Sequence, residues 1–366
     1  MTSKARELAN LGNAYSDGAL SNRNLVINGA MQVAQRGTSF TGVTSGGYRT
    51  CDRWFFDIGS SDTGAWTVSQ EADGPAGFSK SMKFECTTAK TDISSDYRYV
   101  NLQQRLEGQN VTSAKFGTSS AESLTVSFWV KSNKTGTYTV EMANENAAFR
   151  QSQEFSVSSS GTWEKKAITM SGDTAHGFAS DNGISLYLIF FLAASPNLSS
   201  GSLNTSWSSV ESGRVSSSNV NLADTVGNYF QITGVQLEVG DTATPFEHRS
   251  YGDELARCQR YCQVYVNPPL RGVTRSTRVN RAGMSLPVSM RAAPSFSINQ
   301  TGSSNHMPFY DGNVTRFFSS LQTNYSDKTS LELDINITDT FSTNGLAACC
   351  YKSDDYASEV VLDSEL

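Results

Sequence analysis

The chain has 366 residues and a net charge of −6, and only 17% of its residues are charged. This length is enough for two domains, or for one large β domain with an appendage. The acidic balance gives no reason to expect nucleic-acid binding, and no apolar run is long enough to predict a membrane span. The chain opens without a charged-then-apolar leader, so we expect it to be made and kept in a cytosol unless something else carries it out.

The composition favours an all-β protein, because short apolar runs alternate with segments rich in Gly, Ser, Thr and Asn. The six cysteines match neither a disulfide framework nor a common zinc pattern. We therefore expect buried free thiols, no bound metal and no cofactor. A four-thiolate site formed by Cys258, Cys262, Cys349 and Cys350 is the weaker alternative.

Residues 1–23 are expected to form an N-terminal anchor segment. A short helix is predicted up to Gly12, with Ala5, Leu8 and Leu11 on one side, and a polar linker follows it. A helix of this length is marginal on its own, so the segment either frays or docks onto another chain.

From Asn24 onward, about eleven short strand-like segments follow one another, separated by Gly, Ser, Asn and Asp. This regular spacing predicts a jelly-roll β-sandwich over residues 24–248. The run ISLYLIFFLA is apolar on both faces and is expected to be a central strand. The serine-rich residues 199–218 are expected to form a long surface loop.

A helix that links two domains is predicted over residues 249–264. Ser250 and Asp253 have the spacing of a capping box at its start, and Pro268 with Pro269 prevents it from continuing. If one face of this helix packs against other copies of the chain, the oligomer contact is formed by Leu255, Cys258 and Cys262.

The remaining residues, 265–366, are expected to form a second and smaller β-sandwich. No Asp or Glu occurs between Leu255 and Tyr310, while the last strand is acidic. Two explanations stay open: basic strands pair with acidic ones within or between subunits, or the arginines form a face for an anionic surface polymer. The arginines of this stretch are Arg257, Arg260, Arg271, Arg275, Arg278, Arg281 and Arg291.

No catalytic constellation is evident, so we expect the protein not to be an enzyme. His176, His248 and His306 stand in loop-like contexts without a serine or cysteine nucleophile motif, and no phosphate-binding glycine loop precedes a helix. Paired carboxylates for glycoside hydrolysis need no fixed spacing, and Glu141 and Glu154 are candidates for that alternative.

Outward-facing aromatic and amide side chains suggest carbohydrate binding. Strand alternation puts them opposite the core positions of three strands, and rings beside amides and an arginine suit a pyranose. The alternative is that a loop or a neighbouring subunit covers these positions. By contrast, Trp54 and Trp163 are expected in the core. The predicted carbohydrate-binding residues are Tyr97, Tyr99, Asn101, Gln103, Arg105, Trp129, Tyr229 and Gln231.

Two passages together resemble a known family. NLVINGAMQVAQRG with CDRWFF, and QLEVGDTATPFEHRSYGDELARCQRYC, resemble the opening and close of a jelly-roll domain in phage structural and tail-fibre-like proteins of the cyanophage type. The SKARELANLGNA opener and the SEVVLDSEL ending are also similar to those proteins. More distantly, the first and last strands resemble those of β-sandwich carbohydrate-binding modules, which often hold a structural calcium. In this chain Gln32 and Gly234 stand where its carboxylates would be.

The resemblance implies a virion component, usually a homotrimer, that recognises a host-surface polysaccharide. Our first hypothesis is therefore a phage fibre or adhesin whose N-terminal segment contacts other virion proteins. The alternatives are a capsid or tail decoration or connector protein with a purely structural role, and a polysaccharide depolymerase.

Overall fold

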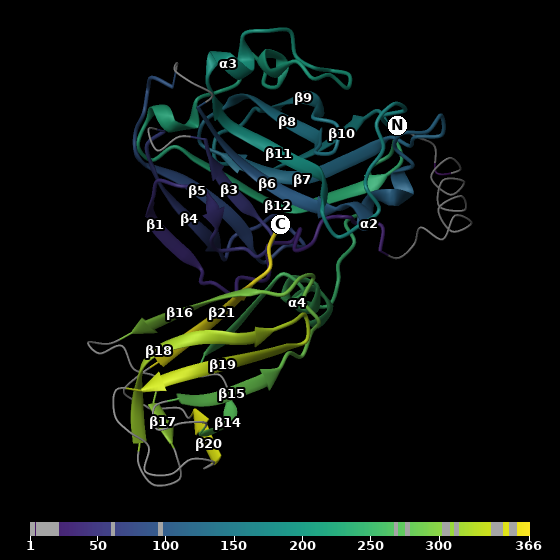
Figure 1. Ribbon diagram of the computed structural model, residues 1–366. Coiled ribbons are helices and arrows are strands. Elements are labelled where there is room, and N and C mark those ends of the chain that lie inside the picture. The colour runs from purple at the N-terminus through teal and green to yellow at the C-terminus, as the bar shows by residue number, and fades with distance from the viewer. Residues whose placement is uncertain are drawn as a thin grey trace. The chain divides into compact units, whose positions relative to one another are not determined.

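The computed structural model of the chain describes residues 4, 22–59, 63–93, 98–266, 270–274, 279–301, 308–310, 315–337, 347–350 and 357–366. Most of the predicted anchor, residues 1–23, lies outside these ranges. The chain divides into two compact units, Met1–Glu254 with Leu366, and Leu255–Glu365 (Figure 1).

Within the described residues, the first unit is a sandwich of two six-stranded antiparallel sheets, as the sequence predicts. One sheet has the order β1 (Ser39–Val43), β4 (Ala65–Glu71), β5 (Ser81–Thr88), β12 (Tyr229–Val239), β7 (Leu124–Ser132), β10 (Glu164–Met170). The other has the order β2 (Gly47–Tyr48), β3 (Phe55–Ile58), β6 (Tyr99–Glu107), β11 (Ile184–Ala194), β8 (Gly136–Asn144), β9 (Phe149–Val157). The central position of β11 between β6 and β8 confirms the prediction made from its apolar sequence.

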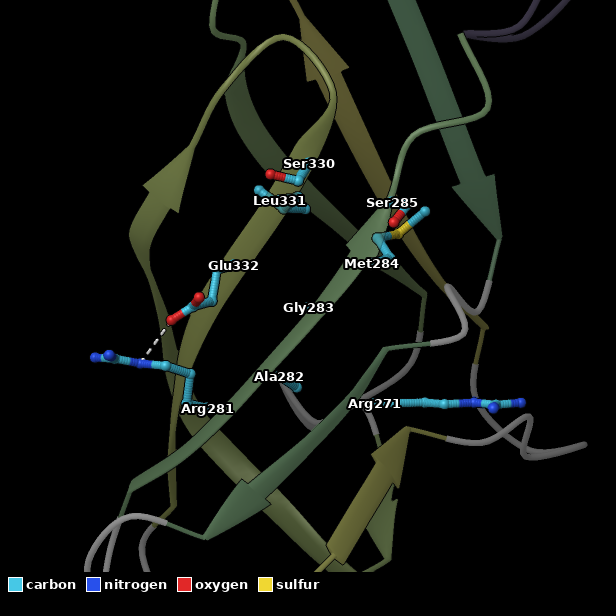
Figure 2. A pocket seen from close by; sticks show the side chains of 9 residues that line it. All are labelled: Arg271, Arg281, Ala282, Gly283, Met284, Ser285, Ser330, Leu331 and Glu332. Atoms are coloured by element: carbon cyan, nitrogen blue, oxygen red, sulfur yellow. Dashed lines mark ion pairs between the residues drawn. The ribbon is translucent and has the colours of Figure 1, made fainter. Parts of the chain in front are cut away.

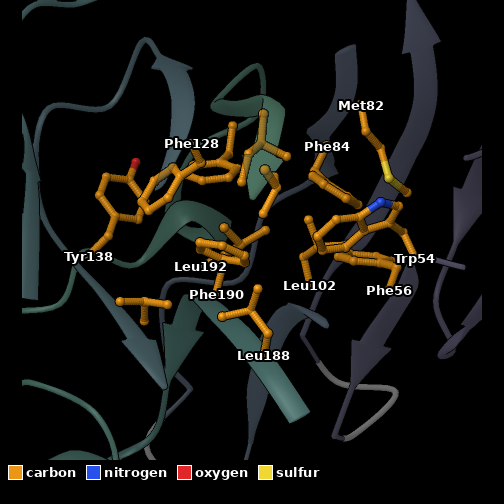
Figure 3. Close-up of a cluster of buried hydrophobic side chains, with 14 of the residues drawn as sticks. Trp54, Phe56, Met82, Phe84, Leu102, Phe128, Tyr138, Leu188, Phe190 and Leu192 are labelled. Atoms are coloured by element: carbon orange, nitrogen blue, oxygen red, sulfur yellow. The ribbon is translucent and has the colours of Figure 1, made fainter. Parts of the chain in front are cut away.

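The core between the two sheets is built from large aromatic and aliphatic side chains (Figure 3). Phe56 of β3 stacks on Phe84 of β5 with ring centroids 4.9 Å apart, and Phe128 of β7 meets Phe190 of β11 edge to face at 5.0 Å. Trp54 is fully buried, as expected. Each such ring contributes about 1.5–3 kcal/mol by burial, so this core fixes which residues of each strand point outward.

The opening passage from Asn24 to Val33 was expected to be a strand but has irregular backbone. Asn28 and Met31 have φ angles of 58° and 56°, which break the alternation of a strand. The passage instead joins β12 through side-chain and backbone hydrogen bonds. Asn24 Oδ1 accepts from Leu237 N at 3.1 Å, and Leu25 N donates to Leu237 O at 2.8 Å.

A buried arginine, Arg249, holds the opening passage in place. We call the group formed by Arg249, Glu247, Glu254 and the opening passage the Arg249 clamp. The guanidinium donates to the carbonyls of Asn24 and Val26 and forms ion pairs with Glu247 at 3.2 Å and Glu254 at 3.6 Å. Glu247 in turn accepts from Asn24 N at 2.9 Å. The two passages that carry the family resemblance therefore hold each other in place.

The short helices of the described chain lie mainly in connections: α2 (Gly108–Val111), η1 (Thr112–Ala114), α3 (Pro196–Ser199), η2 (Glu211–Gly213) and η3 (Leu222–Asp224). Residues 195–220, which include the predicted surface loop, form a strap that packs on the outer face of β8, β9 and β11 (Figure 1). Arg214 in this strap makes three hydrogen bonds to the fully buried Glu141, at 2.7, 3.1 and 3.3 Å.

Helix α4 (Tyr251–Gln259) is shorter than the predicted 249–264. Its predicted cap is present, because Ser250 Oγ accepts from Asp253 N at 3.2 Å. Cys262 begins strand β13 instead of ending the helix. Cys258 and Cys262 are both fully buried within the chain, whereas Leu255 keeps partial exposure. The predicted oligomer contact stays a prediction.

In the second unit, the described strands form a three-stranded sheet and a closed six-stranded barrel, where a smaller sandwich was expected. The sheet has the order β13 (Cys262–Val266), β21 (Ala357–Asp363), β16 (Ser295–Thr301). The barrel has the order β14 (Arg271–Thr274), β15 (Val279–Ser285), β19 (Ser330–Ile337), β18 (Thr315–Ser326), β17 (Pro308–Tyr310), β20 (Ala347–Cys350).

The arginine-rich strands of the barrel pair with acidic neighbours at one described position. Arg281 of β15 donates to Asp334 of β19 at 2.7 Å, so a basic strand lies beside an acidic one within the chain. The acidic partner at this position is on β19. Arg275 and Arg278 lie outside the described residues.

Replacing Arg249 with alanine is expected to lower the free energy of unfolding by about 3–5 kcal/mol, because Glu247 and Glu254 lose a buried counter-charge. Urea denaturation followed by circular dichroism measures the change. Lys165→Ala, an exposed substitution on β10, is the control and should stay within about 0.5 kcal/mol of wild type. A loss for Arg249→Ala no larger than that of the control would contradict the clamp.

Candidate functional site

The predicted carbohydrate-binding residues fall on the outer faces of two different sheets. Tyr99, Asn101, Gln103 and Arg105 belong to β6, whereas Trp129 belongs to β7 in the other sheet. Tyr229 and Gln231 lie on β12, next to β7. Tyr97 lies outside the described residues. The chain therefore offers two separate candidate surfaces on opposite sides of the sandwich.

The first surface, which we call the Tyr99 face, covers the outer side of β2, β3, β6 and part of β11. Its positions point outward because Phe56, Ile58, Val100 and Leu102, their neighbours along β3 and β6, lie in the core. The face consists of Tyr48, Phe55, Asp57, Tyr99, Asn101, Gln103, Arg105 and Tyr187.

A carboxylate lies at the centre of the Tyr99 face. Asp57 Oδ2 accepts from Tyr99 Oη at 3.1 Å and from Gln103 Nε2 at 2.9 Å. Burial raises the pKa of Asp57 above its ordinary value, although Tyr99, Arg105 and Gln103 favour the ionised form. Burial and the nearby Asp57 charge raise the pKa of Tyr99 to about 12, so its hydroxyl keeps its proton and remains a donor.

Aromatic rings and a guanidinium surround this carboxylate. The guanidinium carbon of Arg105 lies 4.2 Å from the ring centroid of Phe55 and 5.8 Å from that of Tyr187. Tyr48 meets Phe55 edge to face at 5.0 Å. Phe55, Tyr99 and Tyr187 are all half-buried, so part of each ring is exposed to solvent.

One acceptor on this face is unused. Asn101 lies beside Asp57 of β3 and Phe191 of β11 in the strand register and is 3% exposed. Its Oδ1 atom is buried and has no hydrogen-bond partner in the described part of the chain. A buried acceptor without a partner is costly, and because this atom is buried a ligand hydroxyl would reach it only after a neighbouring side chain moves.

The strap bounds the Tyr99 face on one side. The strap residues Leu198 and Val215 pack with Ile189 and Phe191 of β11. The β8 and β9 half of the outer face is therefore covered, and the β2, β3 and β6 half is left to the Tyr99 face.

The second surface, the Trp129 face, lies on β7, β12 and the start of β10. It consists of Asp73, Trp129, Lys131, Trp163, Tyr229 and Gln231. Asp73 forms an ion pair with Lys131 and accepts from Gln231 Nε2 at 3.1 Å and Trp163 Nε1 at 3.4 Å. Trp163 was expected in the core but is half-buried, because it points to the outer side of the sheet. The Lys131 ammonium lies 5.2 Å from the centroid of its ring.

The two faces differ in how fully their polar groups are used. The Lys131 ammonium beside Asp73, with help from Trp163 and Gln231, holds the pKa of that carboxyl below its usual range. Asp73 is thus stabilised in its ionised form by its neighbours. Asp57 is under-stabilised by comparison, and beside it Asn101 has an unused acceptor. The Tyr99 face therefore has the greater capacity to bind a polar ligand.

Sequence reasoning missed Phe55, Asp57 and Tyr187 on the Tyr99 face and Asp73 on the Trp129 face. Phe55 and Asp57 were detectable, because they alternate with the core residues Phe56 and Ile58 in DRWFFDI. Asp73 lies in a loop between β4 and β5, where strand alternation gives no signal.

The residues considered for hydrolysis have other contacts. Glu141 is fully buried against Arg214, and Glu154 accepts a hydrogen bond from Ser216 of the strap. His176 faces Asp173 at 2.9 Å and stacks on Phe149, with ring centroids 3.9 Å apart. Both carboxylates of the proposed hydrolytic pair therefore help to hold the strap.

Within the ranges that the structure describes, no group of three or more His, Cys, Asp or Glu side chains is placed to hold a metal ion. At the calcium position implied by the resemblance, Gln32 and Gly234 supply no carboxylate, and a side chain at Gly234 would meet the Phe78 ring at 2.7 Å. The residues therefore do not fit such an ion. No helix in the described ranges is long and apolar enough to cross a membrane.

The sequence matches no protein-family model and no curated protein. The chain is similar in structure to the enzymatically active domain of tailspike protein 4 of bacteriophage CBA120, with 13% identity and a TM-score of 0.32. The match covers 59% of this chain and 21% of the tailspike chain. A putative sugar-binding protein from Bacteroides thetaiotaomicron gives 14% identity and a TM-score of 0.34, covering 59% of this chain and 99% of the other.

A family 11 carbohydrate-binding module of a Clostridium thermocellum cellulase is also similar, with 10% identity, a TM-score of 0.27, and coverage of 60% of this chain and 96% of the module. These likenesses are too weak to carry a functional argument.

Asp57→Asn is expected to leave the free energy of unfolding at pH 7 equal to or above that of wild type. The pKa of Asp57 is higher in the folded than in the unfolded chain, so the folded protein binds more protons between the two values. The free energy of unfolding of wild type therefore falls as pH rises through this interval. As pH falls toward about 4, the free energies of unfolding of wild type and Asp57→Asn approach each other. Thermal melts from pH 4 to pH 8 measure this.

Asp73→Asn is the matched control and has the opposite sign. The pKa of Asp73 is lowered, so its charge stabilises the fold above the unfolded pKa, and that stability is lost as pH falls. The variant should have a lower free energy of unfolding than wild type at pH 7, and this difference should disappear at acidic pH. If Asp57→Asn destabilises at pH 7 as Asp73→Asn does, the description of Asp57 as under-stabilised is wrong.

Proposed function

We propose that the chain is a fibre or adhesin protein of a phage virion that binds a host-surface glycan, and that the Tyr99 face holds the glycan. The observation that carries the proposal is the under-stabilised Asp57 carboxylate among partly exposed rings, with the unused Asn101 acceptor beside it. The proposal places the mature protein in the virion, after synthesis in the host cytoplasm.

The chemistry of the Tyr99 face suits a saccharide. A pyranose offers C–H faces that pack on rings such as Phe55, Tyr99 and Tyr187, and hydroxyls that can both donate and accept. A sugar hydroxyl that donates to Asp57 would supply the hydrogen bonding that burial withholds from this carboxylate. Arg105 Nη1 already donates to the carbonyl oxygen of Leu366 at 2.5 Å, as Tyr48 Oη does at 3.1 Å. Its other N–H groups could donate to a ring or hydroxyl oxygen.

The phage origin is supported by the two sequence passages that resemble phage fibre proteins. These passages meet at the Arg249 clamp, and the CDRWFF segment of the first one also supplies Phe55 of the Tyr99 face. The same proposal includes a homotrimer and contact with other virion proteins through residues 1–23. Of the predicted contact residues, Leu255 keeps partial exposure, and Cys258 and Cys262 are buried within the chain.

The Trp129 face is the second candidate position for the same function. Its rings, Trp129, Trp163 and Tyr229, are half-buried, as those of the Tyr99 face are. Its polar groups are already paired with one another, so a sugar would have to displace existing hydrogen bonds to Asp73. We therefore rank it below the Tyr99 face.

Tyr99→Ala is expected to weaken binding of an oligosaccharide from the host surface polysaccharide at least tenfold, about 1.4 kcal/mol, because it removes a ring and a hydrogen-bond donor. Isothermal titration with the full chain measures the effect. Trp129→Ala removes a ring of similar exposure from the opposite face and should leave the affinity within about twofold of wild type.

The comparison distinguishes the possible outcomes. Loss with Trp129→Ala but not with Tyr99→Ala would move the site to the Trp129 face. Absence of binding by wild type across the surface polysaccharides of susceptible hosts would contradict an adhesin and favour the decoration protein. Melting curves of both variants verify that each is folded.

A further inference from the structure

The barrel of the second unit contains an open pocket that the proposed function does not use (Figure 2). Its volume is about 450 Å³, within the range of small-molecule sites. The pocket is lined by Arg271, Arg281, Ala282, Gly283, Met284, Ser285, Ser330, Leu331 and Glu332. All of them belong to the neighbouring strands β14, β15 and β19.

Gly283 makes the hollow possible. It pairs with Arg271 of β14 on one side and with Glu332 of β19 on the other. The middle one of these three neighbouring positions therefore has no side chain. A Cβ atom at this position would lie 2.7 Å from the carbonyl oxygen of Leu331, closer than a real side chain allows. Figure 2 shows Arg271 on one side of the β15 strand, and Arg281 and Glu332 on the other.

The two arginines of the pocket differ in their charge balance. Arg281 is neutralised by Asp334, with contacts of 2.7 and 2.8 Å, and by Glu332 at 3.0 Å. Arg271 is exposed and has no ion-pair partner in the described part of the chain. One side of the pocket is therefore cationic, and the other carries an ion-pair cluster that contains the carboxylates Glu332 and Asp334.

We propose that this pocket binds a saccharide unit that carries a single carboxylate, such as a uronic acid linked to a neutral sugar. The Arg271 guanidinium would take the carboxylate through paired hydrogen bonds. Ser285, Ser330 and Glu332 offer hydroxyl and carboxylate oxygens for sugar hydroxyls. Met284 and Leu331 alternate with these residues and belong to the hydrophobic core of the second unit, so they support the strands that line the pocket.

The charge distribution favours this ligand over a polyanion. A peptide or polymer with carboxylates at every position would place one of them near Glu332 and Asp334, where like charges repel. A ligand with one carboxylate at the Arg271 end and hydroxyls elsewhere avoids that repulsion. The binding site for the anionic group would then be independent of the Tyr99 face.

The test uses the full chain and an aldobiouronic acid, a disaccharide of one glucuronic acid and one neutral hexose. We expect saturable binding by isothermal titration. Arg271→Ala should lower the affinity at least tenfold, and Arg271→Lys should lower it less, because lysine keeps the charge but lacks the paired N–H donors of the guanidinium. The carboxyl-reduced disaccharide is the matched ligand control and should bind at least tenfold more weakly. Affinity for the acid should also fall with added salt.

Tyr99→Ala should leave this affinity unchanged, which separates failure here from failure of the proposed function. Equal affinity of wild type and Arg271→Ala, or of the acid and its reduced form, would overturn the proposal. A glutamate-rich peptide that binds as tightly as the disaccharide would contradict the saccharide assignment. Melting curves should show that Arg271→Ala, an exposed substitution, folds as wild type does.

Discussion

The Arg249 clamp is the constraint on which the rest of the first unit depends. The Arg249 side chain is 7% exposed. Its guanidinium joins two carboxylates, Glu247 and Glu254, to the carbonyls of the opening passage. The opening passage cannot pair as a regular strand, since Asn28 and Met31 have positive φ angles. Its attachment to β12 therefore relies on specific hydrogen bonds, and β12 supplies the centre of one sheet.

The sandwich has two outer faces, and their chemistry differs. On the Trp129 face the polar groups satisfy one another, and the lowered pKa of Asp73 reflects that mutual stabilisation. On the Tyr99 face the raised pKa of Asp57 and the unpaired Oδ1 of Asn101 reflect the opposite condition. Polar groups kept in an under-satisfied state reduce stability, and such a reduction is expected where a ligand completes the hydrogen bonding.

The strand pattern was the part of the fold most open to prediction from sequence. Alternation in β6, β7 and β12 correctly separated core from outward residues, because side chains in a strand alternate regardless of the partner strands. It could not show that β6 belongs to one sheet and β7 to the other, since strand order depends on long-range pairing. One predicted group of ligands therefore became two, on opposite faces. The helix pattern at Cys258 and Cys262 has a similar limit. An apolar helix face requires burial, but the pattern does not say whether the same chain or another copy provides it; in the structure both residues are buried within the chain.

The central claim is that the Tyr99 face binds a host-surface glycan. A crystal structure of the full chain with an oligosaccharide from that glycan tests it most directly. We expect a sugar ring packed against Tyr99, Phe55 or Tyr187, with a hydroxyl donating to Asp57. A sugar bound only at the Trp129 face or only in the barrel pocket, with the Tyr99 face empty, would contradict the account.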